Sequence, residues 1–152
     1  MSHSPGPAAR ELARELANGP SEEASPAGDR GLERAVEVGV GRRPTVALAL
    51  AEGCVDVTAT DVVDRDVPDP VRFARDDVTD PDHAIYADAD LVYALNCPPE
   101  LQRPAREVAR EVGATFRFTT LGGDPAVVPA ESRYVADETL FTASAQAPDR
   151  RE

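Results

Sequence analysis

Short apolar runs alternate with helix-forming stretches along most of the chain. Each run is rich in β-branched or aromatic residues, and most are followed closely by Gly, Asp or Asn, which is typical of buried strands. The predicted strands are 35–38, 55–60, 71–74, 91–95 and 115–120, with a sixth at 138–143, and the predicted helices between them are 44–52 and 98–112. This alternation predicts an α/β fold, with a Rossmann-like, mostly parallel sheet of five to six strands and helices on both faces.

The first 31 residues have a different pattern. Residues 8–17 are strong helix formers, with Leu12 and Leu16 four positions apart on one side of the predicted helix. Residues 21–31 are rich in Glu, Ser, Pro and Gly, which predicts a flexible linker. We therefore expect an N-terminal helix and linker over 1–31, a Rossmann-like domain over 32–143, and a disordered tail over 144–152.

The charge of the chain bears on its partners. It carries 28 acidic residues against 16 basic ones, all of them Arg, which gives a net charge of -12. The acids are spread along the sequence, and this is typical of the surface of a salt-adapted protein. Nucleic acid and anionic membranes both require basic surface, so neither is expected as the main partner. A homodimer or a protein partner remains compatible with this composition.

The cysteines, the histidines and the hydropathy of the chain argue against a zinc protein and against a membrane-spanning one. The two cysteines, Cys54 and Cys97, form no CxxC pair, and the two histidines, His3 and His83, are isolated. A zinc site is therefore not expected. No apolar run approaches the roughly 20 residues of a membrane-spanning helix, and the first residues lack the apolar core of a signal peptide. We expect a cytoplasmic protein.

Unusual residues follow each predicted strand. Because ligands of parallel sheets bind beyond the carboxyl ends of the strands, this placement predicts a site at that edge. The residues that follow strands are Gly39 and Gly41, Asp61, Asp77, Asn96, and Gly122 with Gly123.

The segment from Glu37 to Pro44 is the most informative. Glycines between a strand and a helix allow a ligand to approach the backbone, and the helix start offers free N–H groups. Asp61 stands 20 residues after Gly41, where a carboxylate can bind ribose hydroxyls. Together they indicate a nucleoside-containing cofactor; the alternative is a structural turn beside a solvent-facing Asp. The dinucleotide fingerprint requires a third glycine where this chain has Pro44.

An acid at the end of the first strand, followed by two glycines, resembles motif I of class I S-adenosylmethionine methyltransferases. The resemblance implies that Glu37, Gly39 and Gly41 surround the amino-acid half of S-adenosylmethionine and that Asp61 binds its ribose. The segment from Asp77 to Asp80 resembles the acidic motif after the third strand, where Asp77 and the backbone of Val78 would bind adenine. Arg42 and Arg43 depart from the pattern and either bind a carboxylate or phosphate or pair with surface acids.

Residues 96–99, Asn-Cys-Pro-Pro, partly resemble the Asn/Asp-Pro-Pro-aromatic motif of amino-group methyltransferases. By that resemblance Asn96 is the candidate catalytic residue, holding the methyl acceptor. Cys97 is inserted after the Asn, and Glu100 stands where the motif has an aromatic residue. The alternative is that Asn96 and the prolines only begin a helix.

Residues 32–143 as a whole resemble an uncharacterised family of small archaeal proteins with a methyltransferase-like Rossmann fold. The resemblance implies the fold, S-adenosylmethionine as cofactor and a salt-adapted archaeal source, but no established reaction. The leading hypothesis is a small S-adenosylmethionine-binding protein and candidate methyltransferase. Two alternatives stay open: an NAD- or nucleotide-binding enzyme, and a non-catalytic module that binds a protein partner, because a full methyltransferase sheet has more strands than the sequence predicts.

Overall fold

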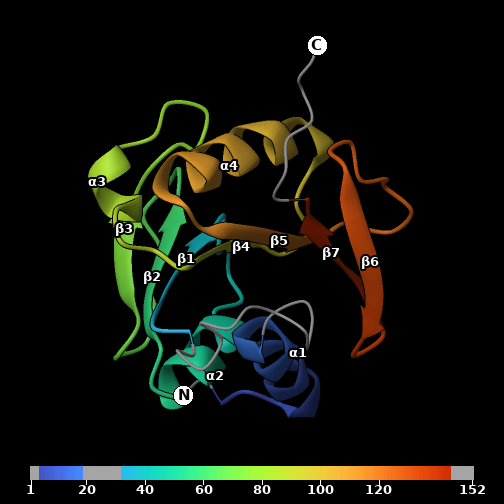
Figure 1. Ribbon diagram of the computed structural model, residues 1–152. Helices are drawn as coiled ribbons and strands as arrows, with labels where there is room; N and C mark the ends of the chain where they lie inside the picture. Colours follow the sequence, from blue (N-terminus) through green and yellow to red (C-terminus); the bar gives the residue numbers. More distant parts are fainter. Residues whose placement is uncertain (1–3, 19–31, 145–152) are drawn as a thin grey trace.

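A seven-stranded sheet crosses the middle of the molecule (Figure 1). This computed structural model describes residues 4–18 and 32–144. The strands are β1 (Arg34–Val38), β2 (Asp56–Asp61), β3 (Arg72–Arg75), β4 (Leu91–Ala94), β5 (Thr115–Thr119), β6 (Ala130–Val135) and β7 (Glu138–Ala143). The helices are α1 (Pro7–Asn18), α2 (Thr45–Glu52), α3 (His83–Tyr86) and α4 (Pro99–Val112).

The strand order is β3-β2-β1-β4-β5-β7-β6. β1 to β5 are mutually parallel, β7 is antiparallel to β5, and β6 is antiparallel to β7. Consequently β7 alone runs against the other described strands. The order β3-β2-β1-β4-β5 is that of Rossmann-type sheets, in which β2 and β3 lie on one side of β1 and β4 and β5 on the other. The predicted fold class is confirmed.

Helices cover both faces of the sheet: α1 and α2 lie on one face, and α3 and α4 on the other (Figure 1). Successive residues of a strand point to opposite faces, so each strand contributes to two cores. In β4, Leu91 and Tyr93 pack toward α1 and α2, whereas Val92 and Ala94 pack toward α4. This double burial explains why β4 is buried and apolar at all four of its positions.

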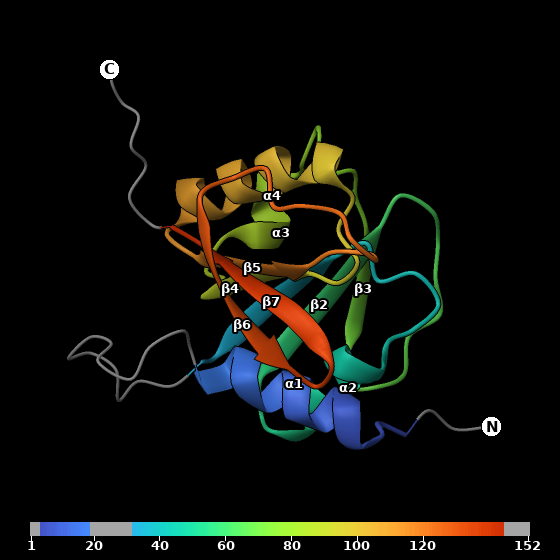
Figure 2. The same ribbon diagram turned by 90° about the vertical axis from the view of Figure 1, so that its right-hand side faces the viewer.

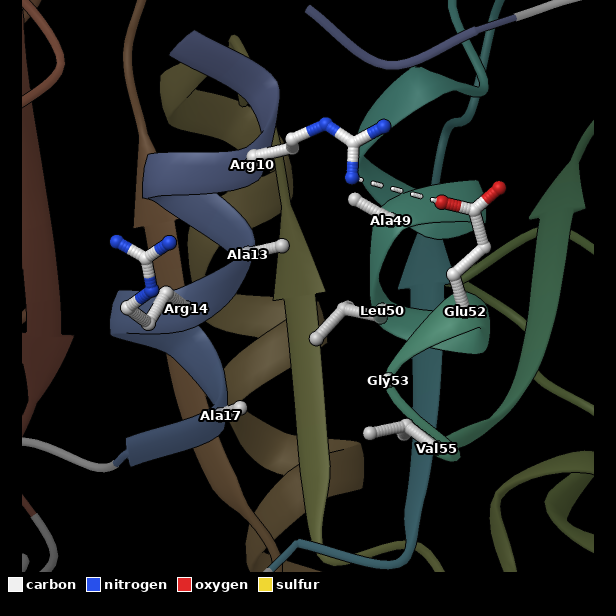
Figure 3. Close-up of a pocket in the computed structure, with 9 residues that line it drawn as sticks. All are labelled: Arg10, Ala13, Arg14, Ala17, Ala49, Leu50, Glu52, Gly53 and Val55. Atoms are coloured by element: carbon white, nitrogen blue, oxygen red, sulfur yellow. Dashed lines mark ion pairs between the residues drawn. The ribbon is translucent and has the colours of Figure 1, made fainter. Parts of the chain in front are cut away.

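The N-terminal helix α1 belongs to the same core. Leu12 and Leu16 are 3% and 2% exposed and pack with residues of α2 and the sheet. Ala13 and Ala17 of α1 point toward α2, and Leu50 of α2 points toward α1 (Figure 3). The expected linker at 21–31 and all but the first residue of the expected tail at 144–152 lie outside the described residues.

One strand and one short helix were not predicted. β6 was missed because only Val135 of its six residues is buried, so its sequence lacks the apolar pattern of a core strand. It is joined to β7 by Ala136 and Asp137, which both have positive φ (53° and 67°), as in a type I′ turn. The four-residue α3 begins at Asp82, whose side chain accepts a hydrogen bond from the Ala84 backbone N–H at 3.1 Å. The sheet therefore has seven strands instead of five or six.

None of the helices in the described part of the chain is long and apolar enough to cross a membrane.

Candidate functional site

A cavity of about 360 Å³ lies beyond the carboxyl end of β1. The glycine loop after β1 and the first residues of α2 form one side of it, the end of β4 another, and the N-terminal part of α1 closes it. Its lining consists of Ala8, Ala9, Leu12, Glu37, Gly39, Val40, Gly41, Arg42, Arg43, Thr45, Val46, Leu95, Asn96 and Glu138. Four of the residues singled out from the sequence, Glu37, Gly39, Gly41 and Asn96, therefore meet at one cavity.

The loop after β1 requires glycine at two positions. Gly39 and Gly41 have φ of +72° and +60°, a left-handed conformation that other residues adopt only with strain. A Cβ atom at either position would meet nothing within 4 Å, so the backbone conformation and not crowding demands glycine. The N–H of Val40 donates to the carbonyl oxygen of Thr60 at 2.9 Å, which ties the loop to β2.

Asp61 braces this loop. Its Oδ2 accepts a hydrogen bond from the backbone N–H of Gly41 at 2.8 Å, and its Oδ1 accepts one from the N–H of Val62 at 2.8 Å. Longer contacts of 3.4 Å join it to the N–H of Val63 and to Nε of Arg65. Partial burial raises the pKa of Asp61, but the hydrogen bonds, Gly41's first, and the charge of Arg65 bring it below its ordinary value. Asp61 is therefore ionised at neutral pH.

Glu37 lies at the floor of the cavity and is 1% exposed. The hydroxyl of Tyr93 donates to its Oε1 at 2.9 Å. Burial raises the pKa of Glu37 to about 8; the negative charge of Asp61 adds to this effect, and the hydrogen bond from Tyr93 opposes it. The carboxyl group is consequently neutral near pH 7 while nothing positive faces it.

Asp61, Asp77 and Val78 are not among the residues that line the cavity. Asp77 is exposed, and its Oδ1 accepts hydrogen bonds from the hydroxyl and the N–H of Thr79 at 2.7 and 2.9 Å. These bonds hold the pKa of Asp77 below its usual value. Val78 is buried on the α4 face of the sheet.

Asp76, which the sequence analysis did not single out, holds the chain together after β3. Its Oδ2 accepts a hydrogen bond from the hydroxyl of Tyr86 at 2.8 Å, and its Oδ1 accepts one from the N–H of Asp82 at 2.9 Å. Its own N–H donates to the carbonyl oxygen of Asp61 at 2.9 Å. The ends of β2 and β3 are thereby fixed relative to each other.

Asn96 reaches the cavity wall from the end of β4. It adopts a left-handed conformation, with φ of 55°, and its N–H donates to the hydroxyl of Thr119 at 2.8 Å. The next N–H, that of Cys97, donates to the carbonyl oxygen of Thr119 at 2.7 Å. Burial raises the pKa of the Cys97 thiol to about 12, so it stays protonated and unreactive at neutral pH.

Sequence reasoning missed other residues at this edge. The wall from Ala8 to Leu12 was predicted as a helix, but nothing in the sequence indicated where that helix packs. Val62 and Val63, directly after Asp61, are 55% and 44% exposed and form an apolar surface beside the carboxylate. Arg42 and Arg43, noted in the sequence, are exposed at the rim of the cavity. In the described part of the chain, no three His, Cys, Asp or Glu side chains gather as a metal site.

Comparison with protein families gives a match over residues 24–146 to "Uncharacterised protein family (UPF0146)". The chain is a member of this family. A relative from Halobacterium salinarum is 60% identical over 111 residues, covering 72% of this chain and 86% of that protein. One from Archaeoglobus fulgidus is 48% identical over 91 residues, covering 60% of this chain and 70% of that protein. The expected membership of an uncharacterised archaeal family is confirmed.

Solved structures similar to this member of the family include a methyltransferase and a domain crystallised with S-adenosylhomocysteine. An RNA methyltransferase from Salinibacter ruber in complex with S-adenosyl-L-homocysteine has a TM-score of 0.55 at 16% identity, covering 78% of this chain and 85% of that one. The N-terminal domain of EvdMO1, in the presence of S-adenosylhomocysteine and D-fucose, has a TM-score of 0.56 at 17% identity. The match covers 92% of this chain and 69% of that one. At these identities the likeness shows a methyltransferase-like Rossmann fold.

Proposed function

We propose that the chain binds S-adenosylmethionine at the carboxyl edge of its sheet and that methyl transfer is its chemistry. The observation that carries the proposal is the cavity beyond β1, where the glycine loop, two acids and two arginines surround one space. The methyltransferase-like fold is consistent with this proposal. When bound, this cofactor supplies an electrophilic methyl group to an acceptor.

The charges around the cavity suit the amino-acid half of the cofactor. An α-amino acid is a zwitterion, and the cavity has Glu37 at its floor and Arg42 and Arg43 at its rim. A carboxylate would be held by an arginine and by the free N–H groups at the start of α2. An ammonium group would face Glu37 and favour its ionised form. The volume of about 360 Å³ lies within the range of small-molecule sites.

Asp61 and the residues after it suit the nucleoside half. Two of the four contacts of this carboxylate are long, at 3.4 Å, and ribose hydroxyls would replace them with shorter hydrogen bonds. The exposed surfaces of Val62 and Val63 offer an apolar face to the adenine ring. Asp77 and the N–H of Val78 would bind the edge of that ring, at the far end of the site.

Asn96 is the residue that we assign to the methyl acceptor. It is exposed at the cavity wall, on the β4 side of the glycine loop. Methyl transfer requires in-line placement of the acceptor, so the chain contributes mainly by orientation. The hydrogen bonds from the N–H groups of Asn96 and Cys97 to Thr119 fix the backbone from which this side chain projects.

The test measures binding of S-adenosylhomocysteine in concentrated KCl, by calorimetric titration and by the shift of the thermal midpoint of unfolding. Ligand at about 100 times its dissociation constant should add about 2.7 kcal/mol of stability. Asp61→Asn should weaken binding about tenfold or more, because a hydrogen bond to a charged group is lost. Glu107→Gln, at an exposed position of α4, is the matched control and should bind as the unmodified chain does.

Absence of binding at millimolar S-adenosylhomocysteine contradicts the proposal. NAD is tested in parallel, because Arg42 and Arg43 at the start of α2 can also face a phosphate. Binding of NAD without S-adenosylhomocysteine would favour the alternative of a dinucleotide-dependent enzyme.

A further inference from the structure

The outer edge of the sheet at β6 is uncovered by any other strand of the described chain. Figure 2 shows the hairpin of β6 and β7 from the side, with α1 below it. Four consecutive residues of β6, from Glu131 to Tyr134, are exposed, and Tyr134 is 73% exposed. Exposed strand edges are pairing sites unless the sequence prevents it, so the edge residues decide what can bind here.

The hydrogen-bonding pattern of the β6–β7 hairpin shows which backbone groups of β6 do not bond to β7. In antiparallel pairs, hydrogen-bonded and non-hydrogen-bonded positions alternate. The N–H of Ser144 donates to the carbonyl oxygen of Pro129 at 2.9 Å, which makes these two residues a hydrogen-bonded pair. By alternation Glu131, Arg133 and Val135 also bond to β7. Ala130, Ser132 and Tyr134 then direct their N–H and C=O groups away from the sheet.

The side chains of β6 are self-complementary about Ser132. Glu131 and Arg133 flank it and carry opposite charges. If a second β6 pairs antiparallel with Ser132 opposite Ser132, Glu131 of each strand lies opposite Arg133 of the other. The same register places Ala130 opposite Tyr134, so the outward-directed backbone groups of both strands pair. Glu131 and Arg133 then occupy non-hydrogen-bonded positions, where opposed side chains are closest.

We propose that β6 pairs antiparallel with β6 of a second copy of this chain, centred on Ser132, so that the two sheets become one. The association is isologous, with both copies using the same surface.

The contacts of Arg133 within one chain support this arrangement. Its Nη1 lies 3.3 Å from Oε2 of Glu15 in α1, which holds the side chain on the α1 face of the sheet. Glu131 is two residues away on the same strand and therefore shares that face. In the dimer, Arg133 lies between Glu15 of its own chain and Glu131 of the second copy.

The opposite edge of the sheet lacks this property. β3 has the sequence Arg-Phe-Ala-Arg, with Arg72 and Arg75 at its ends. The centre of this four-residue strand lies between Phe73 and Ala74, whose N–H and C=O groups point to opposite sides, so β3 cannot pair antiparallel with a second β3 about its own centre. The symmetric placement of opposite charges about a central residue therefore favours pairing at β6.

Charge reversal tests the register. Glu131→Arg leaves only positive charges at the two positions, and Arg133→Glu leaves only negative ones. Each variant alone should dissociate about tenfold more readily than the unmodified chain, as measured by sedimentation equilibrium in KCl. An equimolar mixture of the two variants should recover association as a heterodimer, because both arginines of one variant then face both glutamates of the other.

A second variant tests the backbone. Ser132→Pro removes an N–H that points away from β7, so it should leave the hairpin folded, by thermal midpoint, and abolish association. Glu107→Gln, on α4, should associate normally. A chain that stays monomeric at high concentration in KCl overturns the proposal, and so does a mixture of charge variants that fails to associate while both variants remain folded.

Discussion

Arg117, buried in β5, donates from Nη1 to the backbone carbonyl oxygen of Glu15 at 2.8 Å. Glu15 lies in the last turn of α1, where helix carbonyls have no partner within the helix. Nε of Arg117 also donates to the hydroxyl of Thr142 in β7 at 2.9 Å. One side chain thus fixes the helix that closes the cavity to two strands of the sheet.

We expect Arg117→Met to lower the free energy of unfolding by about 3 kcal/mol, because it leaves partly buried acceptors without a donor. It should also weaken binding of S-adenosylhomocysteine, since α1 forms a wall of the cavity. Chemical denaturation and calorimetry measure the two effects. The control is Arg10→Met, because the Arg10–Glu52 pair of 3.8 Å is exposed and should contribute less than about 1 kcal/mol (Figure 3). Equal losses in the two variants would contradict this role of Arg117.

The raised pKa of Glu37 predicts a specific pH dependence of stability. Its pKa is about 8 in the folded chain against 4.5 for the free side chain. Between these pH values the folded state binds more protons than the unfolded state. The contribution of Glu37 to stability is therefore complete below pH 4.5 and is lost as the pH rises to about 8. Within this window the free energy of unfolding should fall by up to about 1.4 kcal/mol for each pH unit of increase.

Glu37→Gln removes this titration while keeping an acceptor for the Tyr93 hydroxyl. The difference in unfolding free energy between the variant and the unmodified chain should therefore change across that window, at constant KCl. A difference that stays constant with pH would show that Glu37 titrates normally.

The carboxyl group of Glu37 should couple cofactor binding to the release of a proton. If an ammonium group faces Glu37, binding ionises it, and a proton is released below about pH 8. Calorimetric titration with S-adenosylhomocysteine in buffers of different ionisation enthalpy measures that proton. The release should disappear in Glu37→Gln. Binding with no proton release would place the ammonium group elsewhere, without contradicting binding itself.

The glycine loop should tolerate no side chain at its left-handed positions. Gly39→Ala and Gly41→Ala should each cost about 1 to 2 kcal/mol of stability, because alanine is strained at positive φ. Gly123→Ala is the matched control, since Gly123 has no positive φ and a Cβ atom there would meet nothing within 4 Å. Thermal midpoints distinguish the two kinds of position. Equal losses of stability in Gly39→Ala and Gly123→Ala would show that the positive φ of Gly39 is not the reason for glycine at that position.

The sequence predicted the buried, parallel part of the fold because its strands are apolar runs between helices. It did not predict β6, whose exposed residues carry no apolar signal, nor the position of α1. For the site, the placement of Gly41 and Asp61 after predicted strands indicated that both lie at one edge of the sheet, and a 2.8 Å hydrogen bond joins them there. Binding of a ribose by Asp61 stays a prediction. The neutral state of Glu37 could not be predicted, because it depends on complete burial of the carboxyl group, which the sequence around Glu37 does not indicate.

The helix α1 ends at Asn18, whereas the match to the family begins at residue 24. The shared segment of the family therefore carries the loop, the floor and Asp61, while the wall at Ala8, Ala9 and Leu12 is supplied by sequence that lies outside the match. Substitutions at Ala8, Ala9 or Leu12 should therefore change the cavity through residues that the family match does not include.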